Sequence, residues 1–212
     1  SLINKLDDND LSIPEIINVF YKRINERNNE INAVISKIPY RKLQKEILLS
    51  EKRRLENKRL SPLDGFPIAI KDLEETQGIL TTLGSKIFQK NIPKIDSPMV
   101  SNLKKSGCLI LGKTNVPEFG IGSQTYNEIF GSTKNPFDLE LTSGGSSGGA
   151  AAAVSTGMIP FADGSDMMGS LRNPASFCSV FGFRPTPGLI PSKKTDNFLP
   201  KQIGRDPCRE RL

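Results

Sequence analysis

Serine and lysine are the residue types in this sequence whose placement could support covalent catalysis. The 212 residues contain no histidine, which excludes every mechanism in which a histidine activates a serine or cysteine nucleophile. The absence of histidine also removes the ligand on which most catalytic zinc sites depend. Any acid–base catalysis must therefore come from lysine, aspartate, glutamate, tyrosine or cysteine.

Lys71 is a candidate base because it directly follows the apolar run of residues 67–70. A lysine activates a serine only while its amine is neutral, and burial favours that form because a low dielectric penalises the ammonium ion. A lysine that follows a strand is also often exposed and without a catalytic role. Its position alone leaves both interpretations open.

Two segments could supply serine hydroxyls. Residues 143–149 read Ser-Gly-Gly-Ser-Ser-Gly-Gly and lead into a run of alanines. This indicates a tight turn at the start of a helix, although a flexible linker has a similar composition. Residues 166–170 read Asp-Met-Met-Gly-Ser, where backbone N–H groups beside Ser170 could form an oxyanion hole. Aspartate and glycine before a serine are also ordinary turn chemistry.

The elements that would position these residues alternate between helices and strands. A capping box at Ser12 and Glu15 opens a predicted helix over residues 12–27, and residues 40–58 predict a second, highly charged helix. The alternation is typical of an α/β fold with a largely parallel or mixed sheet. Further strands are expected at residues 65–70, 108–111, 158–162 and 179–183, and further helices at 97–105 and 150–154.

Residues 107–114 match the phosphate-binding loop pattern, which raises a nucleotide-binding module as an alternative of a different class. Such a loop presents backbone N–H groups between its glycines and starts a helix at its Lys-Thr end. Here the four intervening residues are hydrophobic, and no helix begins at Lys113. The pattern therefore favours a strand and a turn, with Lys113 on the surface or in a structural role.

Charge and cysteine content argue against several classes. Much of the basic excess behind the net charge of +6 lies in residues 42–59 and 193–211. Neither stretch alternates aromatic with basic residues, so we expect no nucleic-acid site. Three widely spaced cysteines form neither a disulfide framework nor a metal motif. Without an apolar run of membrane-spanning length or a secretory signal, we expect a cytoplasmic protein with no membrane contact.

Taken together, several ordered motifs resemble the amidase signature family. The resemblance covers roughly residues 12–191 and implies an α/β fold, in which a mixed β-sheet core is covered by helices on both faces. The resemblance also accounts for the phosphate-loop match, because residues 112–115 belong to the family's own pattern. The matching segments are residues 65–72, 112–115, 144–149, 164–172, 177–178 and 182–186.

The resemblance implies a triad of a serine, a second serine preceded by a cis peptide bond, and a lysine. Ser170 matches the nucleophile, Ser146 the bridging serine and Lys71 the base. Neutral Lys71 would draw a proton through Ser146, which would deprotonate Ser170 as it attacks an amide carbonyl. Water would then hydrolyse the acyl-enzyme by the same relay.

The resemblance also implies which residues surround the triad, and it implies neither a cofactor nor a metal ion. Backbone N–H groups of the nucleophile loop would stabilise the oxyanion. The expected oxyanion donors are Met167, Met168, Gly169 and Ser170, and the expected supporting residues are Ser147, Asp166 and Arg172.

One position departs from the family's usual pattern. Many members have two glycines before the nucleophile, where this chain has Met168 and Gly169. We interpret this difference as the mark of a stand-alone amidase that acts on a small carboxamide or aryl amide. The alternatives are the glutaminase component of a glutamyl-tRNA(Gln) amidotransferase, which is its A subunit, and an inactive fragment.

We expect a single, incomplete amidase domain, because the family's domain is considerably longer and its C-terminal portion completes the sheet and the pocket. Residues 12–60 would form an N-terminal helical segment, residues 63–191 the catalytic core and residues 192–212 an atypical tail. The expected partner is a small-molecule amide, and a homo-oligomer is compatible with the sequence.

Overall fold

A three-stranded mixed β-sheet organises the fold. The computed structural model describes residues 2–192, and its strands are β1 (Val34–Ile35), β2 (Pro67–Lys71) and β3 (Leu109–Thr114), in the order β1-β3-β2. β2 and β3 run parallel, whereas β1 runs antiparallel to β3. The sequence prediction of a mixed sheet is confirmed.

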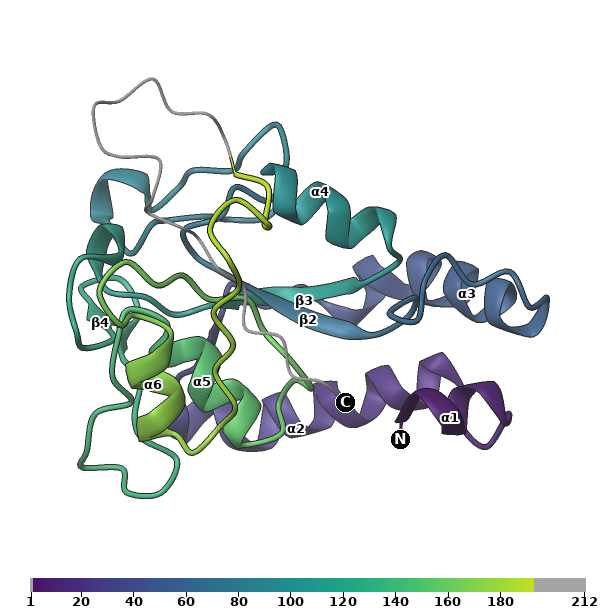
Figure 1. Ribbon diagram of the computed structural model, residues 1–212, viewed down its shortest axis with the longest axis horizontal. Coiled ribbons are helices and arrows are strands. Elements are labelled where there is room, and N and C mark those ends of the chain that lie inside the picture. Colours follow the sequence, from purple (N-terminus) through teal and green to yellow (C-terminus); the bar gives the residue numbers. More distant parts are fainter. Residues whose placement is uncertain (1, 193–212) are drawn as a thin grey trace.

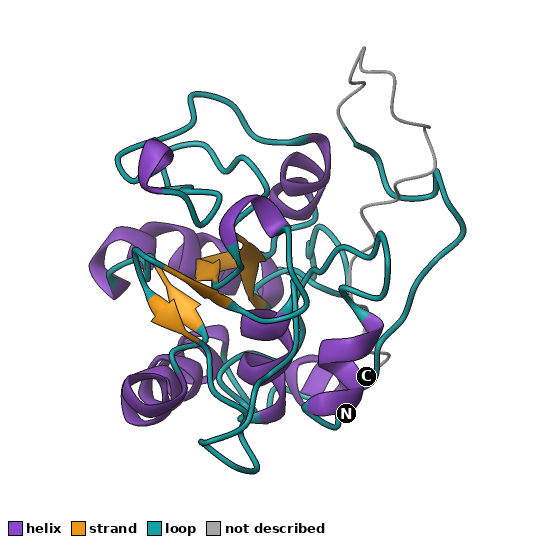
Figure 2. Ribbon diagram, turned by 90° about the vertical axis from the view of Figure 1, so that its left-hand side faces the viewer, coloured by secondary structure: helices purple, strands orange, loops and turns teal. Residues whose placement is uncertain are grey.

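Helices cover both faces of this sheet (Figures 1 and 2). One face carries α4 (Pro98–Lys105), and the opposite face carries α2 (Ile13–Ile31) and α5 (Gly148–Ser155). A further helix, α3 (Tyr40–Leu55), packs against α2 and also contacts β3. This arrangement is the α/β architecture expected from the sequence.

The remaining elements are short and lie in the connections. β4 and β5 form an antiparallel pair apart from the main sheet. The short elements are α1 (Leu2–Asp7), η1 (Lys86–Phe88), η2 (Glu118–Gly120), β4 (Tyr126–Asn127), β5 (Gly131–Ser132) and α6 (Arg172–Phe177).

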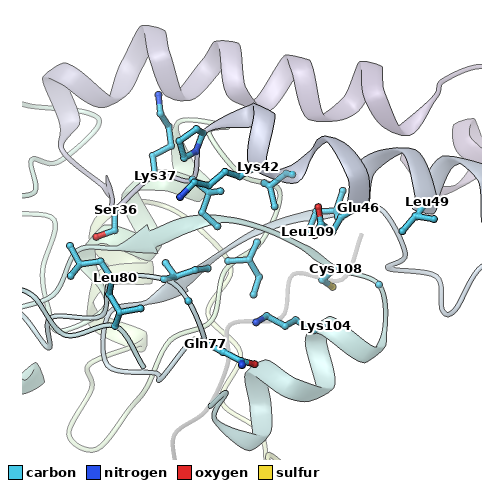
Figure 3. A pocket seen from close by; sticks show the side chains of 18 of the residues that line it. Ser36, Lys37, Lys42, Glu46, Leu49, Gln77, Leu80, Lys104, Cys108 and Leu109 are labelled. Atoms are coloured by element: carbon cyan, nitrogen blue, oxygen red, sulfur yellow. The ribbon is translucent and has the colours of Figure 1, made fainter. Parts of the chain in front are cut away.

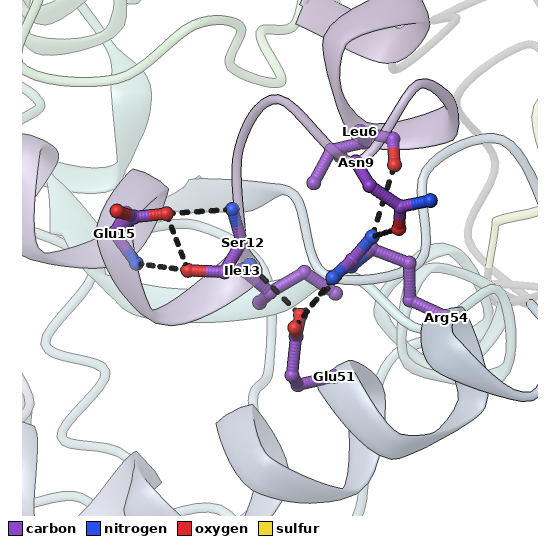
Figure 4. A network of polar contacts seen from close by, with 7 residues as sticks. All are labelled: Leu6, Asn9, Ser12, Ile13, Glu15, Glu51 and Arg54. Carbon is purple, nitrogen blue, oxygen red and sulfur yellow. Dashed lines mark hydrogen bonds and ion pairs between the residues drawn. The ribbon is translucent and has the colours of Figure 1, made fainter.

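The long helix α2 begins at the predicted capping box (Figure 4). Ser12 Oγ accepts the Glu15 N–H at 3.4 Å, and the Glu15 carboxylate accepts the Ser12 N–H at 2.8 Å. These bonds satisfy N–H groups that have no partner within the helix. α2 continues past its predicted end to Ile31, where Asn32 adopts a left-handed conformation with φ 56°, a C-cap geometry that asparagine tolerates.

A partly buried ion pair on α3 joins the three N-terminal helices (Figure 4). The Glu51 carboxylate accepts the Ile13 N–H at the start of α2 at 3.0 Å and pairs with Arg54 at 2.6 Å. Arg54 also donates to Leu6 O at 3.1 Å and to Asn9 Oδ1 at 2.6 Å. Because each charge is satisfied by several hydrogen bonds, the pair can be buried without an orphaned polar group.

β2 and β3 are buried along their whole length, as expected for parallel strands covered on both faces. Their register shifts once, between Ile68 and Ala69, where Leu111 is an extra residue in β3 and forms a β-bulge. Beyond the bulge, Ile70 lies opposite Lys113 and Lys71 lies opposite Thr114. Since paired residues in a parallel sheet share a face and successive residues alternate, Lys71 and Lys113 point to opposite faces.

The glycines and alanines of α5 allow it to approach the sheet closely. A Cβ atom on Gly149 would lie 2.6 Å from the carbonyl oxygen of Asn115 and 2.9 Å from the carbonyl oxygen of Ala33. The alanine run that follows, residues 150–153, is buried. Small side chains therefore place the N-terminus of α5 against the carboxyl ends of β2 and β3.

The predictions of two further strands, at residues 158–162 and 179–183, are wrong. Residues 158–162 are buried but contribute only one isolated parallel bridge, between Ala69 and Ala162, because Pro160 has no N–H to donate and the chain turns away. Residues 179–183 form no strand. They follow α6, which was not predicted from the sequence, and Ser179 has a left-handed φ of 53°. Phe181 and Phe183 are exposed, so the apolar pattern of this segment did not mark a buried strand.

The predicted tail, residues 192–212, lies outside the described residues except for Ser192, as do the basic run 193–211 and Cys208. Within the part of the chain that the structure describes, no helix is both long enough and apolar enough to cross a membrane.

We expect Gly149→Ala to lower the free energy of unfolding by about 1–3 kcal/mol, the usual range for overpacking. Helix propensity alone would favour alanine by about 1 kcal/mol, but the clashing Asn115 atom belongs to the backbone and cannot rotate away. Urea denaturation measures the change, with Ser155→Ala at the other end of α5 as the control. A Gly149→Ala protein as stable as the parent would contradict this account of the packing.

Candidate active site

Lys71, the predicted base, is the last residue of β2 and is only 1% exposed. Its amine meets the serine-rich loop where that loop enters α5. Lys71 Nζ lies 2.8 Å from Ser146 Oγ and 2.7 Å from Ser147 Oγ. A third hydroxyl, Ser165 Oγ, lies 2.8 Å away. The structure thus brings together the predicted base and the predicted bridging serine.

Three hydroxyls around one buried amine suit proton exchange. A hydroxyl both donates and accepts, so the cluster can satisfy an ammonium group that donates three times or a neutral amine that accepts from one serine. Burial disfavours the charged form of any amine, whereas hydroxyl groups in contact with it solvate that form. A proton can therefore pass between Ser146 and Lys71 along one hydrogen bond of 2.8 Å.

The backbone around Ser146 is tightly enclosed. The Gly145–Ser146 peptide bond is cis, as the family resemblance implied. A Cβ atom on Gly145 would lie 2.7 Å from the backbone nitrogen of Gln124, so only glycine fits at that position. Ser147 reinforces the loop, since its hydroxyl also accepts the Ser165 N–H at 3.3 Å.

Ser170, the predicted nucleophile, ends the loop of residues 164–170 and is partly exposed. Its carbonyl oxygen accepts the Ser147 N–H at 3.0 Å, which fixes its backbone beside the serine-rich loop. Within the described part of the chain, no hydrogen bond involves Ser170 Oγ. The structure therefore places Ser170 beside the serine-rich loop through its backbone, without a hydrogen bond between the Ser170 and Ser146 hydroxyls.

Asp166 holds the nucleophile loop in shape. Its buried carboxylate accepts the Gly169 N–H at 2.8 Å and the Arg172 N–H at 3.2 Å. The Arg172 guanidinium binds both carboxylate oxygens, at 2.8 and 3.0 Å. Burial alone would raise the pKa of Asp166, but Arg172 and the two N–H groups hold it well below its usual value. Asp166 and Arg172 are thus joined to each other within the segment that carries Ser170.

The Asp166 contact corrects one predicted oxyanion donor. The Gly169 N–H is directed at the Asp166 carboxylate and is not free to stabilise an oxyanion. Among the described residues, the backbone N–H groups of Met167, Met168 and Ser170 have no hydrogen-bond partner. These three remain candidate donors.

Two residues at this site, Ser165 and Asp163, were not predicted from the sequence. Ser165 contacts the Lys71 amine directly, and its place next to Asp166 in a matching segment was a usable signal. Asp163 accepts the Lys71 N–H at 2.7 Å and is 2% exposed. No local pattern marked it, because its partner lies 92 positions away in the chain.

Lys113 has a structural role, and the nucleotide-binding alternative for residues 107–114 is wrong. Lys113 is buried within β3, where Nζ donates to Glu74 O at 2.5 Å and to Thr76 Oγ1 at 2.9 Å. Burial lowers the pKa of Lys113 to about 8, against the opposing effect of the Asp72 charge. A strand whose lysine is enclosed in this way cannot cradle a phosphate.

A cavity of about 820 Å³ lies elsewhere, between α3, α4 and the start of β3 (Figure 3). Its lining includes Lys42, Leu80, Lys104 and Cys108, and none of the predicted catalytic residues lines it. Within residues 2–192, no group of three or more His, Cys, Asp or Glu side chains is placed to hold a metal ion.

The chain is similar in sequence to a known family and to curated proteins of bacteria. The Amidase family model matches residues 15–206. The A subunit of glutamyl-tRNA(Gln) amidotransferase from Natranaerobius thermophilus is 41% identical over 190 residues, covering 87% of this chain. The protein of the same name from Prochlorococcus marinus (strain MIT 9211) is 41% identical over 186 residues, covering 88% of this chain. The chain spans 38% of the length of each of these two relatives.

Several solved structures are similar to this chain in fold and in sequence. A bacterial aryl acylamidase of the amidase signature enzymes superimposes with a TM-score of 0.86 at 33% identity, over 92% of this chain and 40% of that one. The peptide amidase of Stenotrophomonas maltophilia has a TM-score of 0.83 at 28% identity, over 89% and 40%. The A subunit of the Thermotoga maritima glutamyl-tRNA(Gln) amidotransferase has a TM-score of 0.70 at 36% identity, over 84% and 39%.

We expect Asp166→Asn to destabilise the protein by about 1.5–3 kcal/mol at neutral pH, the usual range for hydrogen bonds to charged groups. Because the folded-state pKa of Asp166 is depressed, its carboxylate contributes stability above about pH 4 and loses that contribution as the pH falls further. Urea denaturation from pH 7 to pH 2 should show the two proteins converging in acid. A constant difference across this range would contradict the assigned ion pair.

Proposed function

The chain belongs to the amidase signature family, and we propose on this premise that it carries the catalytic centre for hydrolysis of a carboxylic amide. The observation that carries the proposal is the contact of 2.8 Å between the buried Lys71 amine and Ser146 Oγ. It provides a base for a serine nucleophile in a chain that has no histidine.

The proposed reaction begins with attack of Ser170 Oγ on the amide carbonyl carbon. As the new C–O bond forms, the Ser170 proton passes to Ser146, and the Ser146 proton passes to neutral Lys71. The resulting ammonium then returns its proton through Ser146 to the departing nitrogen, and the C–N bond breaks. Water cleaves the Ser170 ester by the same route, which regenerates the free serine.

We assign the oxyanion hole to the backbone N–H groups of Met167, Met168 and Ser170. Losing one such donor typically costs about 3–4 kcal/mol of transition-state stabilisation. Asp166 supports this assignment, because its bonds to Gly169 and Arg172 fix the loop before substrate arrives. A loop that is already ordered needs little rearrangement as the negative charge develops.

For the substrate, we propose a small carboxamide or aryl amide and a stand-alone enzyme. The Met168 side chain belongs to the loop that carries Ser170, is 82% exposed, and could offer apolar contact to such a substrate. The similarity to a bacterial aryl acylamidase supports the same choice. The cytoplasmic location and a homo-oligomeric state remain predictions.

A second candidate is the glutamine-hydrolysing component of a glutamyl-tRNA(Gln) amidotransferase. It is favoured by 41% identity to proteins named as the A subunit of that enzyme. Release of ammonia from glutamine, together with co-purification of further subunits, would favour this candidate. Release of an amine from an aryl amide by the chain alone would favour the first.

We expect a serine-directed fluorophosphonate to label the chain at Ser170, as located by peptide mass. Ser170→Ala should abolish the adduct. Lys71→Met, which removes the amine but keeps an unbranched side chain, should slow labelling by about 100-fold or more. Ser155→Ala, at the far end of α5, is the control and should label at the parent rate.

The same experiment separates the remaining outcomes. A folded parent chain that forms no adduct would favour the inactive fragment over the proposed hydrolase. An adduct at another serine, or labelling that does not depend on Lys71, would overturn the proposed mechanism. Circular dichroism on each variant shows whether a loss reflects chemistry or folding.

A further inference from the structure

Asp163 lies where the chain leaves the sheet for the nucleophile loop. The preceding residue, Ala162, makes the isolated parallel bridge to Ala69 of β2. Asp163 is 2% exposed, and an isolated carboxylate at such depth is costly. Its position between β2 and the loop of residues 164–170 suggests that the carboxylate has a function.

The carboxylate replaces a strand partner at the edge of β2. Asp163 Oδ1 accepts the backbone N–H of Lys71 at 2.7 Å, at the point where the bridging segment no longer runs beside β2. Without Asp163, this buried N–H would lose its side-chain acceptor, which is unfavourable for a group that water does not reach. Asp163 therefore holds the backbone of Lys71 at a fixed distance from the loop that carries Ser165 and Ser170.

The charges around Asp163 include the proposed base. Lys71 from β2 and Lys113 from β3 interact favourably with the carboxylate, whereas Glu74, after β2, opposes it. Burial and the nearby Glu74 charge together raise the pKa of Asp163 to about 6. The Lys71 N–H group and the charges of Lys113 and Lys71 act in the opposite direction and limit this rise. The ionised form of Asp163 is thus favoured by the Lys71 N–H group and by the two lysine charges.

The neighbouring carboxylate, Asp166, offers a useful contrast. Its charge is already compensated by two hydrogen bonds from the Arg172 guanidinium. Among the described residues, no arginine forms a hydrogen bond with Asp163, and the cations that act on it are lysines buried in the sheet. Asp163 is therefore a carboxylate that no arginine compensates by hydrogen bonds among the described residues, and its charge interacts with those of Lys113 and Lys71.

We infer that Asp163 is a positioning residue that stabilises the ammonium form of Lys71 during acyl transfer. This inference rests on the proposed function, in which the proton of Ser170 reaches Lys71 through Ser146. A buried amine that is neutral at rest must carry a full positive charge in the transition state, and an adjacent carboxylate lowers the free energy of that charge. Asp163 acts through Lys71 and does not contact the substrate.

The same carboxylate limits the pH range of the reaction. By favouring the ammonium ion, it also raises the pH below which resting Lys71 is protonated and inactive as a base. Removing the carboxylate charge should therefore have two opposite effects. The maximal rate should fall, and the acid limb of the pH–rate profile should move to lower pH.

Asp163→Asn tests this inference, because asparagine keeps an oxygen to accept the Lys71 N–H and removes only the charge. The Lys71 side chain is titrated by NMR of protein labelled with ¹³C-lysine, and its ¹³Cε signal is assigned by its loss in Lys71→Met. We expect the midpoint to fall by about one pH unit, the lower end of the range for an opposite charge at close range. Asp163→Ser, which also offers an oxygen, carries the same prediction if Asp163→Asn does not fold.

Asp96→Asn is the matched control, since it removes a carboxylate that pairs with Lys104 on α4 and should leave the Lys71 midpoint unchanged. A Lys71 midpoint in Asp163→Asn that equals or exceeds that of the parent would overturn the inference. The fluorophosphonate labelling rate, measured across pH, should show the same downward shift of its acid limb. Failure of the parent to label at Ser170 would contradict the proposed function. The NMR titration is independent of labelling, because it measures directly how the Asp163 charge affects the titration midpoint of Lys71.

Discussion

The burial of a single amine is the constraint on which the rest of this structure depends. Lys71 Nζ lies out of contact with water, yet it reaches three hydroxyls within 2.8 Å. Those hydroxyls come from two segments distant in the chain, which meet only because β2 ends beside the start of α5 and beside the loop that follows Ala162. Strand, helix and loop must all be in place before the amine has partners, so folding and assembly of the cluster are one event.

Close packing is what makes this meeting possible. Gly145 and Gly149 lie against backbone atoms with no room for a side chain, so the serine-rich loop and α5 approach their neighbours more closely than ordinary residues would permit. The glycine content of the loop therefore reflects contact and not flexibility. The composition alone was also compatible with a flexible linker, but these close contacts show that the linker interpretation is wrong.

The sequence predicted those parts of the fold that are encoded locally. The start of α2 follows from Ser12 and Glu15, and β2 follows from an unbroken apolar run that ends at Lys71. The contact between Lys71 and Ser146 was predicted only from the family resemblance, because no local pattern links residues 75 positions apart. A strand was wrongly predicted at residues 158–162 because burial and strand pairing leave similar apolar patterns. Asp163 was not predicted because its partner, Lys71, lies 92 positions away, and its acceptor role appears only once β2 lies beside it.

The bulge at Leu111 decides how two buried lysines share one sheet. Without this extra residue, the register set by Ile68 and Ile110 would continue unbroken and place Lys113 directly opposite Lys71. Two amines would then face each other across neighbouring strands, and the charge of either would repel the charge of the other. With the bulge, Lys113 turns toward Glu74 and Thr76, while Lys71 turns toward the serines. A single inserted residue thus directs the two amines to opposite faces of the sheet, one to anchor a loop and one to meet the serine hydroxyls.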